Sequence, residues 1–209
     1  MNMFITLEGP DGSGKTRQIE PMADFLRAKG YSVFAAREPG GTSIGDQVRA
    51  ILMNMQNTSM HSRAETLLFC AARAQLVEEV ILPRLRNHEI VLLDRYADST
   101  MAYQGYGHQH DLDLIRSLLD FATGGLKPDL TFLLDVNPEI GLRRRQTGGV
   151  EWNRLDAYQL EYHQRVRQGY LEMARAEPKR WRIVDASQPP DMVQSALQKL
   201  LLSYLSNLS

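Results

Sequence analysis

The chain has 209 residues, 43% of them hydrophobic and 23% charged, a composition typical of one globular domain with a substantial core. Its 24 basic and 25 acidic residues give a net charge of −1, which excludes a chain-wide basic surface for nucleic acid. The single cysteine, Cys70, allows no internal disulfide, and we find neither a leader pattern nor an apolar stretch of about 20 residues, so we expect a cytoplasmic protein without a membrane segment.

Short apolar runs alternate with helix-length amphipathic stretches along the chain. The first strand is expected at 4–7, and the helix that follows its glycine loop ends at Gly30. The further strands are expected at 31–36, 89–94, 130–135 and 181–184. The further helices are expected near 43–54, 63–86, 98–104, 112–122 and 155–176, and from about 190. Five strands, each followed by helix, predict a doubly wound five-stranded parallel sheet in three α/β/α layers, with ligands bound beyond the carboxyl ends of the strands.

A phosphate-binding loop, or P-loop, is predicted between the first strand and the first helix, where the sequence matches the motif in full. The loop consists of Gly9, Pro10, Asp11, Gly12, Ser13, Gly14, Lys15 and Thr16. Its glycines let backbone N–H groups converge on phosphate oxygens at the positive end of a helix dipole. We expect Lys15 to reach the β- and γ-phosphates of a nucleotide and Thr16 to ligate Mg²⁺. The alternative is a glycine-rich turn with a chance lysine.

The charges inside this loop place two conditions on its chemistry. A carboxylate among phosphate-binding amides is costly without a cation, so we expect Asp11 to help hold Mg²⁺, directly or through water. None of the residues from 10 to 13 is basic. Negative charge that develops on a transferred phosphoryl group must therefore be met by an arginine from elsewhere in the chain.

The motif Asp94-Arg95-Tyr96 follows the strand expected at 89–94. Asp94 stands where a Walker B acid would stand, near the metal or a hydroxyl nucleophile. A buried guanidinium needs an anion, which a substrate phosphate would supply to Arg95; an ion pair between neighbours at the sheet edge is the alternative. The chain contains no Asn-Lys-x-Asp sequence for guanine recognition, which argues against a GTPase switch.

Four motifs outside the P-loop point to one family. They are Arg37-Glu38-Pro39-Gly40-Gly41-Thr42, Ala71-Ala72-Arg73-Ala74-Gln75, Asp94-Arg95-Tyr96-x-x-Ser99 and Ala102-Tyr103-Gln104-Gly105. In order and approximate spacing, and nearly end to end, the chain resembles the bacterial thymidylate kinases, which are P-loop nucleoside monophosphate kinases. The resemblance implies Mg²⁺-dependent transfer of the γ-phosphoryl group of ATP to dTMP, giving dTDP and ADP, by a homodimer.

The resemblance also implies the parts of a dTMP site. Phe69 would stack on the thymine ring, with core packing as the alternative. Arg73 would bond a base carbonyl, and the two residues are four apart on one helix face. Tyr103 would lie under the deoxyribose. The remaining contacts are implied for Gln104 and Ser99 or Thr100 on the base, and for Arg37 and Arg95 on the monophosphate.

The basic segment from about 142 to 155 resembles the lid of the family, a mobile segment that closes over ATP and excludes water. We expect Arg145 or Arg144 to meet the charge on the transferred phosphoryl group, and Arg154 to hold substrate or structure. A solvated basic helix end is the alternative for one or two of these arginines. Asp156 would approach the substrate phosphate through Mg²⁺ or water.

Two further positions complete the interpretation. Asn153 stands where the family usually carries Asp, and Gln188, in the segment 185–189, would lie beside the ATP adenine. The alternative for that segment is a plain strand-to-helix turn. We expect residues 1–209 to form a single kinase domain. Two other functions stay open, namely a kinase for another nucleoside or nucleotide and a P-loop switch protein that uses nucleotide to control a partner.

Overall fold

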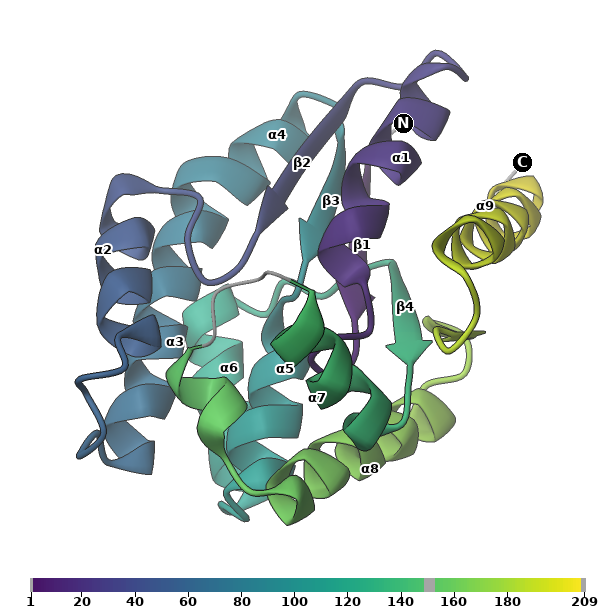
Figure 1. The fold of residues 1–209 in the computed structure, drawn as a ribbon. Coiled ribbons are helices and arrows are strands. Elements are labelled where there is room, and N and C mark those ends of the chain that lie inside the picture. The colour runs from purple at the N-terminus through teal and green to yellow at the C-terminus, as the bar shows by residue number, and fades with distance from the viewer. Residues whose placement is uncertain (1, 149–152, 208–209) are drawn as a thin grey trace.

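The computed structural model describes residues 2–148 and 153–207, and a five-stranded parallel sheet forms its centre (Figure 1). The strands are β1 (Met3–Glu8), β2 (Val33–Arg37), β3 (Ile90–Asp94), β4 (Leu130–Asp135) and β5 (Trp181–Asp185). They pair in the order β2-β3-β1-β4-β5, and each connection between them contains helix. The prediction of a doubly wound five-stranded parallel sheet is therefore confirmed.

Helices cover both faces of this sheet. They are α1 (Lys15–Arg27), α2 (Ser43–Met53), α3 (Ser62–Leu76), α4 (Leu82–Arg86), α5 (Ala97–Thr100), α6 (Leu112–Thr123), α7 (Pro138–Thr147), α8 (Leu160–Ala176) and α9 (Pro190–Ser206). Shorter helical turns lie at Val77–Ile81, Met101–Gly107 and Arg154–Ala157. Among the described residues, every helix is too short or too polar to cross a membrane.

The side chains of β1 alternate between two core layers. Ile5 and Leu7 pack in the layer that contains α1 and α9, whereas Phe4 packs in the layer that contains α3 and α4. Figure 1 shows the sheet between these groups of helices, with α8 beneath β4 and β5. All six residues of β1 are buried, as expected for a parallel strand that is covered on both faces.

The first part of the expected lid lies in a helix. α7 begins after Asn137, whose side chain accepts a hydrogen bond from the backbone N–H of Glu139 at 2.9 Å, and movement of this segment as a lid stays a prediction. Asparagine before proline is a strong helix start, because the side chain caps the first turn and Pro138 needs no N–H partner there. Residues 149–152 of the expected lid lie outside the described residues.

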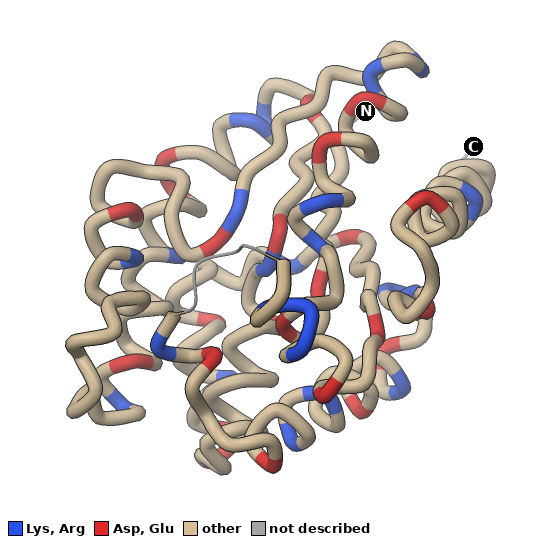
Figure 2. Tube along the Cα trace, in the orientation of Figure 1, with Lys and Arg blue, Asp and Glu red and all other residues tan. Residues whose placement is uncertain are grey.

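Strand register brings the predicted site residues to one edge of the sheet. Asp94, at the end of β3, is level with Leu7 of β1 on one side and with Arg37 of β2 on the other. The P-loop leaves β1 one residue beyond this level. Figure 2 shows basic and acidic residues interspersed along the chain, with a basic run on α7 close to the same edge.

Candidate active site

The P-loop joins β1 to α1 and bends around the ammonium group of Lys15. Lys15 Nζ donates hydrogen bonds to the carbonyl oxygens of Gly9 at 2.8 Å and Pro10 at 2.9 Å. It donates a third to Ser13 Oγ at 3.0 Å. Burial, followed by the charge of the nearby Arg95, lowers the pKa of Lys15 to about 7. The amine therefore sits at the centre of the loop, on acceptors that belong to the loop itself.

Two glycines let the P-loop lie directly on α7. A Cβ atom on Gly12 would lie 2.0 Å from the carbonyl oxygen of Gly141, and one on Gly141 would lie 2.2 Å from the carbonyl oxygen of Asp11. Gly12 also has a φ of 72°, in the left-handed region that favours glycine. Helix α7, which carries Arg144 and Arg145, is thus in close backbone contact with the P-loop, and neither glycine accepts a side chain unless the two segments move apart.

The oxygens of Thr16 and Asp94 lie together beside Lys15. The Thr16 hydroxyl donates a hydrogen bond to Asp94 Oδ2. Both groups offer the hard oxygen ligands that Mg²⁺ prefers, so the pair fits this ion. Within residues 2–148 and 153–207, three or more His, Cys, Asp or Glu side chains nowhere gather into a metal cluster. A magnesium ion held here would therefore draw its other ligands from water and phosphate, as this ion commonly does.

The carboxylate of Asp11 is bound to Arg95. Arg95 donates to Asp11 Oδ1 at 2.7 Å, and the Tyr103 hydroxyl donates to Asp11 Oδ2 at 2.7 Å. Burial would raise the pKa of Asp11, but Arg95 and Lys15 together outweigh burial and lower it. The cation that we expected beside Asp11 is an arginine in this structure, and contact of Asp11 with Mg²⁺ stays a prediction.

A buried carboxylate beneath the site holds Arg95 in place. Arg95 has a φ of 73°, and its guanidinium donates to Ser99 Oγ at 3.0 Å and to the Tyr170 hydroxyl at 3.2 Å. Both hydroxyls in turn donate to Glu8 Oε2, at 2.6 Å and 3.0 Å. Burial, with the nearby charge of Asp98, raises the pKa of Glu8 to about 7. Sequence reasoning missed Glu8 and Tyr170, because a last strand residue and a helical tyrosine carry no motif of their own.

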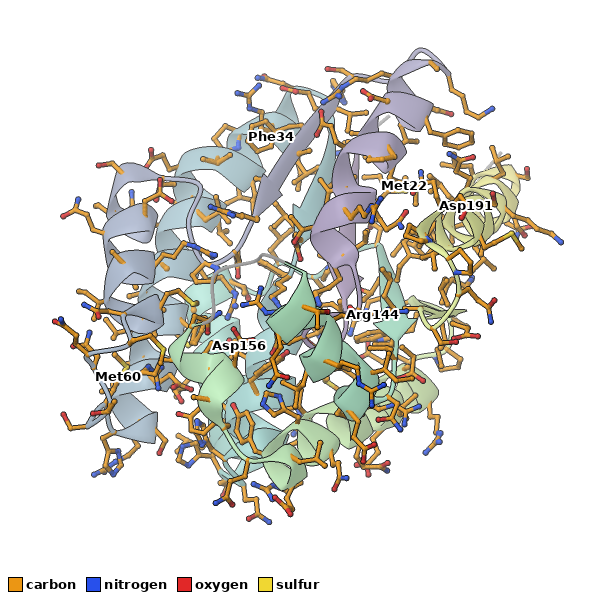
Figure 3. The ribbon with its side chains drawn as sticks, viewed as in Figure 1. Met22, Phe34, Met60, Arg144, Asp156 and Asp191 are labelled. Carbon is orange, nitrogen blue, oxygen red and sulfur yellow. The ribbon has the colours of Figure 1, made fainter. Side chains whose placement is uncertain are left out.

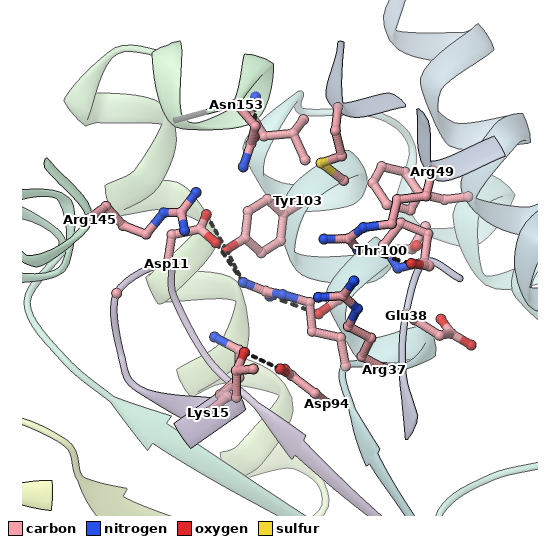
Figure 4. A pocket seen from close by; sticks show the side chains of 18 of the residues that line it. Asp11, Lys15, Arg37, Glu38, Arg49, Asp94, Thr100, Tyr103, Arg145 and Asn153 are labelled. Carbon is pink, nitrogen blue, oxygen red and sulfur yellow. Dashed lines mark hydrogen bonds and ion pairs between the residues drawn. The ribbon is translucent and has the colours of Figure 1, made fainter. Parts of the chain in front are cut away.

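A cavity of about 380 Å³ opens above these groups (Figure 4). Most of the predicted site residues line it. They are Asp11, Gly12, Gly14, Lys15, Thr16, Arg37, Phe69, Arg73, Asp94, Arg95, Ser99, Thr100, Tyr103, Gln104 and Arg145. Gly9, Pro10 and Ser13 lie behind them, on Lys15. The P-loop and the predicted dTMP residues therefore share one space.

The α3 wall of the cavity carries Phe69 and Arg73. Phe69 is half-buried there, while Arg73 is 1% exposed and is bound on its far side. Its Nε donates to Glu38 Oε2 at 2.8 Å, and another N–H donates to Thr100 Oγ1 at 3.0 Å. Burial raises the pKa of Glu38 by more than Arg73 lowers it. Glu38, to which the sequence analysis assigned no role, thus determines where the guanidinium meets the cavity.

The two neighbouring arginines of α7 point to different places. Arg145 lines the cavity, and its Nε donates to Asp156 Oδ1 at 3.0 Å, with a second hydrogen bond to the other oxygen. Arg144 instead donates to the carbonyl oxygens of Ala186 at 2.7 Å and Ser187 at 3.0 Å. Figure 3 labels Arg144 and Asp156 on different sides of α7. Of the two candidates, Arg145 faces the P-loop, and Arg144 supports the turn before α9.

The remaining predicted residues lie around this centre. Gln188 donates to Asp185 at 2.9 Å on the exposed turn before α9. Asn153 lines the cavity and accepts a hydrogen bond from the N–H of Leu155 at 2.9 Å. Arg154 is buried, 7% exposed, and is paired with a glutamate of α3. We expected Arg154 to hold either substrate or structure, and its burial against this glutamate favours the structural role.

Arg49 of α2 is a cavity residue that the sequence analysis did not find. It donates to the carbonyl oxygen of Pro39 at 2.9 Å, and burial, followed by the charge of Arg37, lowers its pKa. Arg37 and Arg49 thus bring two neighbouring cations to the cavity. Arg49 lies in an ordinary amphipathic helix without a motif, so its sequence context offered no signal.

The comparisons with known proteins show which family the chain belongs to. The sequence model of the family described as thymidylate kinase matches residues 7–197. A thymidylate kinase of Roseiflexus sp. (strain RS-1) is 48% identical, over 100% of this chain and 97% of its own length. One from Roseiflexus castenholzii is 50% identical, over 100% of this chain and 96% of its own length.

A solved structure extends the agreement to three dimensions. The crystal structure of thymidylate kinase from Ehrlichia chaffeensis superimposes with a TM-score of 0.77 at 35% sequence identity. The match covers 96% of this chain and 98% of that one. The family resemblance that the motifs indicated is thereby confirmed over nearly the whole length. The chain belongs to the thymidylate kinase family and is a dTMP kinase that uses ATP.

Proposed function

We propose that the enzyme transfers the γ-phosphoryl group of ATP in line to a phosphate oxygen of dTMP within the 380 Å³ cavity. The bond from the γ-phosphorus to its bridging oxygen breaks, and a new bond forms to the dTMP oxygen. That oxygen is already anionic, so no strong general base is needed. The work of the protein is therefore positioning and charge neutralisation.

The donor side uses the P-loop and α7. Lys15 leaves the loop carbonyls and takes the β- and γ-phosphate oxygens as acceptors, which are stronger because they are charged. Mg²⁺, when bound at Thr16 and Asp94, supplies further neutralisation of the phosphates. Arg145 meets the charge on the transferred group. Its pairing with Asp156 supports this role, since the guanidinium is already held at the edge of the cavity that Lys15 also lines.

The acceptor side uses the wall formed by β2, α3 and the segment after β3. Arg37 and Arg95 hold the dTMP phosphate, and Tyr103 packs under the sugar. The thymine ring stacks on Phe69 and forms hydrogen bonds with Arg73, Gln104, and Ser99 or Thr100. Arg95 is the link between the two sides, because it touches the carbonyl oxygen of Gly9 in the P-loop at 3.1 Å.

One observation carries this proposal: Lys15, Arg95 and Arg145 approach one cavity from three separate elements. A coupled assay of ADP release tests it, with dTMP, dUMP, UMP and thymidine as acceptors. We expect dTMP to give the highest kcat/KM, and little ADP release without acceptor. Preference for thymidine or UMP would indicate a different kinase specificity, and slow acceptor-independent hydrolysis would indicate a nucleotide switch.

We also propose that the enzyme is a homodimer built on α2, α3 and α6. Helix α3 packs against both of the others, and large apolar side chains stand exposed on this group. Leu67 is 55% exposed, Leu114 58% and Phe121 89%. Light scattering should give twice the mass of the 23.7 kDa chain, and Phe121→Asp should halve it. Ile183→Asp, at an exposed position on β5, is the matched control and should leave the mass unchanged.

A further inference from the structure

Glu65 lies in the first turn of α3 and is completely buried, with 0% of its side chain exposed. Its two oxygens accept hydrogen bonds from four side chains. Gln104 Nε2 at 2.8 Å and His108 Nε2 at 3.0 Å share Oε1. Arg154 and the Tyr158 hydroxyl, the latter at 3.2 Å, share Oε2. One carboxylate oxygen thus binds Gln104, which lines the cavity, and the other binds the segment 154–158.

The charge state of Glu65 follows from these partners. Burial alone would raise its pKa, but hydrogen bonds from His108, Gln104 and Arg154 outweigh burial and lower the pKa to about 2. At neutral pH the group is therefore ionised. An ionised carboxylate accepts hydrogen bonds and donates none, so every group that faces it must present a donor.

This requirement determines the orientation of the Gln104 amide. Its NH₂ group must point to Glu65, because its oxygen there would oppose another acceptor. Gln104 is 1% exposed and lines the cavity, together with Phe69 and Arg73. With the amide nitrogen turned to Glu65, the amide oxygen is the polar atom that remains to face the cavity. That oxygen accepts hydrogen bonds and cannot donate them.

We propose that Glu65 is a positioning residue for base selectivity, which holds the Gln104 amide so that it accepts a hydrogen bond from the N3–H of a pyrimidine. Thymine and uracil carry a hydrogen on N3, whereas N3 of cytosine is an acceptor. A cytosine nucleotide would therefore place two acceptors against each other. This inference rests on the contact of Gln104 with the base that was proposed above.

The substitution Glu65→Gln reverses the orientation while it preserves the shape of the side chain. The introduced amide has one oxygen and one NH₂ group. Arg154 is a charged donor and takes the oxygen, so the NH₂ group faces Gln104. Gln104 must then offer its own oxygen to this NH₂ group and turn its NH₂ group into the cavity. The cavity now presents a donor at the position where N3–H arrives.

The experiment compares kcat/KM for dTMP, dUMP and dCMP in the wild type and in Glu65→Gln. We expect kcat/KM for dTMP and dUMP to fall in parallel by about tenfold or more through KM, since each would lose the hydrogen bond from N3–H. We expect kcat at saturating dTMP to change by less than about threefold. The ratio of kcat/KM for dTMP to that for dCMP should fall by about tenfold or more. Calorimetric binding of dTMP and dCMP should show the same change in ratio without catalysis.

Two further variants separate selectivity from folding. Tyr158→Phe removes a donor from the other oxygen of Glu65 and should leave the ratio of dTMP to dCMP unchanged. Glu65→Asp keeps an acceptor-only group and should keep most of the ratio even where thermal unfolding shows lost stability. If Glu65→Asp loses the ratio as fully as Glu65→Gln, the residue is structural and the inference is overturned.

The variant Gln104→Met separates the positioning role of Glu65 from the proposed contact of Gln104 with the base, on which that role depends. If Gln104→Met leaves the KM for dTMP unchanged, Gln104 does not touch the base, and both ideas fail. If Gln104→Met raises that KM while Glu65→Gln leaves the ratio unchanged, the base contact stands and the positioning role of Glu65 is wrong. We expect Glu65→Gln to add no further loss of the ratio in the Gln104→Met background, because both act through one amide.

Discussion

The P-loop and the α3 side of the same cavity, here called the wall, differ in how far apart in the sequence their interacting residues lie. In the loop, Lys15 is held by acceptors two to six residues away in the chain. In the wall, Arg73 is paired with Glu38, 35 residues away, and Arg154 with Glu65, 89 residues away. A short stretch of sequence thus contains all the groups that hold Lys15, whereas the base side of the cavity exists only after distant segments have packed.

This difference has consequences for how each region responds to substitution. Removal of the Lys15 side chain takes away a contact to phosphate and leaves the surrounding fold in place, because its partners are oxygens of the loop itself. A change in the wall leaves a buried charge without its partner, which is costly in a low-dielectric interior. We therefore expect loop variants to lose turnover and wall variants to lose stability.

The largest effect is expected from the adjacent arginines of α7. Arg145→Ala should lower kcat by about 10³-fold or more, because it removes the cation that meets the transferred phosphoryl group. Arg144→Ala is the matched control and should mainly raise the KM for ATP, since Arg144 binds the carbonyl oxygens before α9. Steady-state ADP release at saturating substrates measures both. A larger loss of kcat in Arg144→Ala would assign the catalytic role to that residue instead.

The P-loop itself is tested by Lys15→Ala. We expect kcat to fall by about 10²- to 10³-fold, because one preorganised cation at the phosphates is lost. The melting temperature should change little, since burial already disfavours the charged amine in the free enzyme. Lys29→Ala, at an exposed position after α1, should behave as the wild type. Near-normal turnover of Lys15→Ala would refute its assigned role.

The wall is tested by Glu38→Ala, which leaves the buried guanidinium of Arg73 without its carboxylate. We expect the free energy of unfolding to fall by about 3–5 kcal/mol. Arg27→Ala breaks the exposed pairs with Glu20 and Asp24 and should cost at most about 1 kcal/mol. Urea unfolding measures both variants. Equal losses in the two would show that the buried pair of Arg73 and Glu38 stabilises the fold no more than an exposed pair does.

The smallest effect is a proton that accompanies ATP binding. The pKa of Lys15 is about 7 in the free enzyme, and phosphate charges nearby should raise it in the complex. Above pH 7 the complex therefore holds more protons than the free enzyme, so binding should take up less than about one proton and weaken by at most about tenfold per pH unit. Calorimetry at pH 8 in buffers of different ionisation enthalpy measures the uptake, which should disappear in Lys15→Ala.

The sequence predicted some parts of the site and not others. The pattern from Gly9 to Thr16 predicted a nucleotide site, because the residues that form the loop and hold Lys15 are contiguous in the chain. The shared helix face of Phe69 and Arg73 was readable from spacing alone. Glu38 stood inside a recognised motif without an assigned role, because its partner Arg73 lies on another element.

Glu65 shows why other contacts of the site could not be predicted from the sequence. An acidic residue in the first turn of a helix is ordinarily explained by the helix dipole, so its identity raised no question. The structure buries it instead against residues from two later segments. Likewise, Arg144 and Arg145 are equivalent in sequence, and the 100° turn between successive helix positions separates them.

The sequence by itself determined the doubly wound sheet, the P-loop and the kinase family, because apolar periodicity and contiguous motifs are local properties of the chain. The tertiary structure decided which arginine of α7 lines the cavity, which cation meets Asp11 and which carboxylate accepts the hydrogen bond of Gln104. Each of those outcomes depends on the packing of α7, β3 and α3 around one cavity. Local sequence patterns do not specify such long-range pairs, since charge complementarity between distant residues has no fixed spacing along a chain.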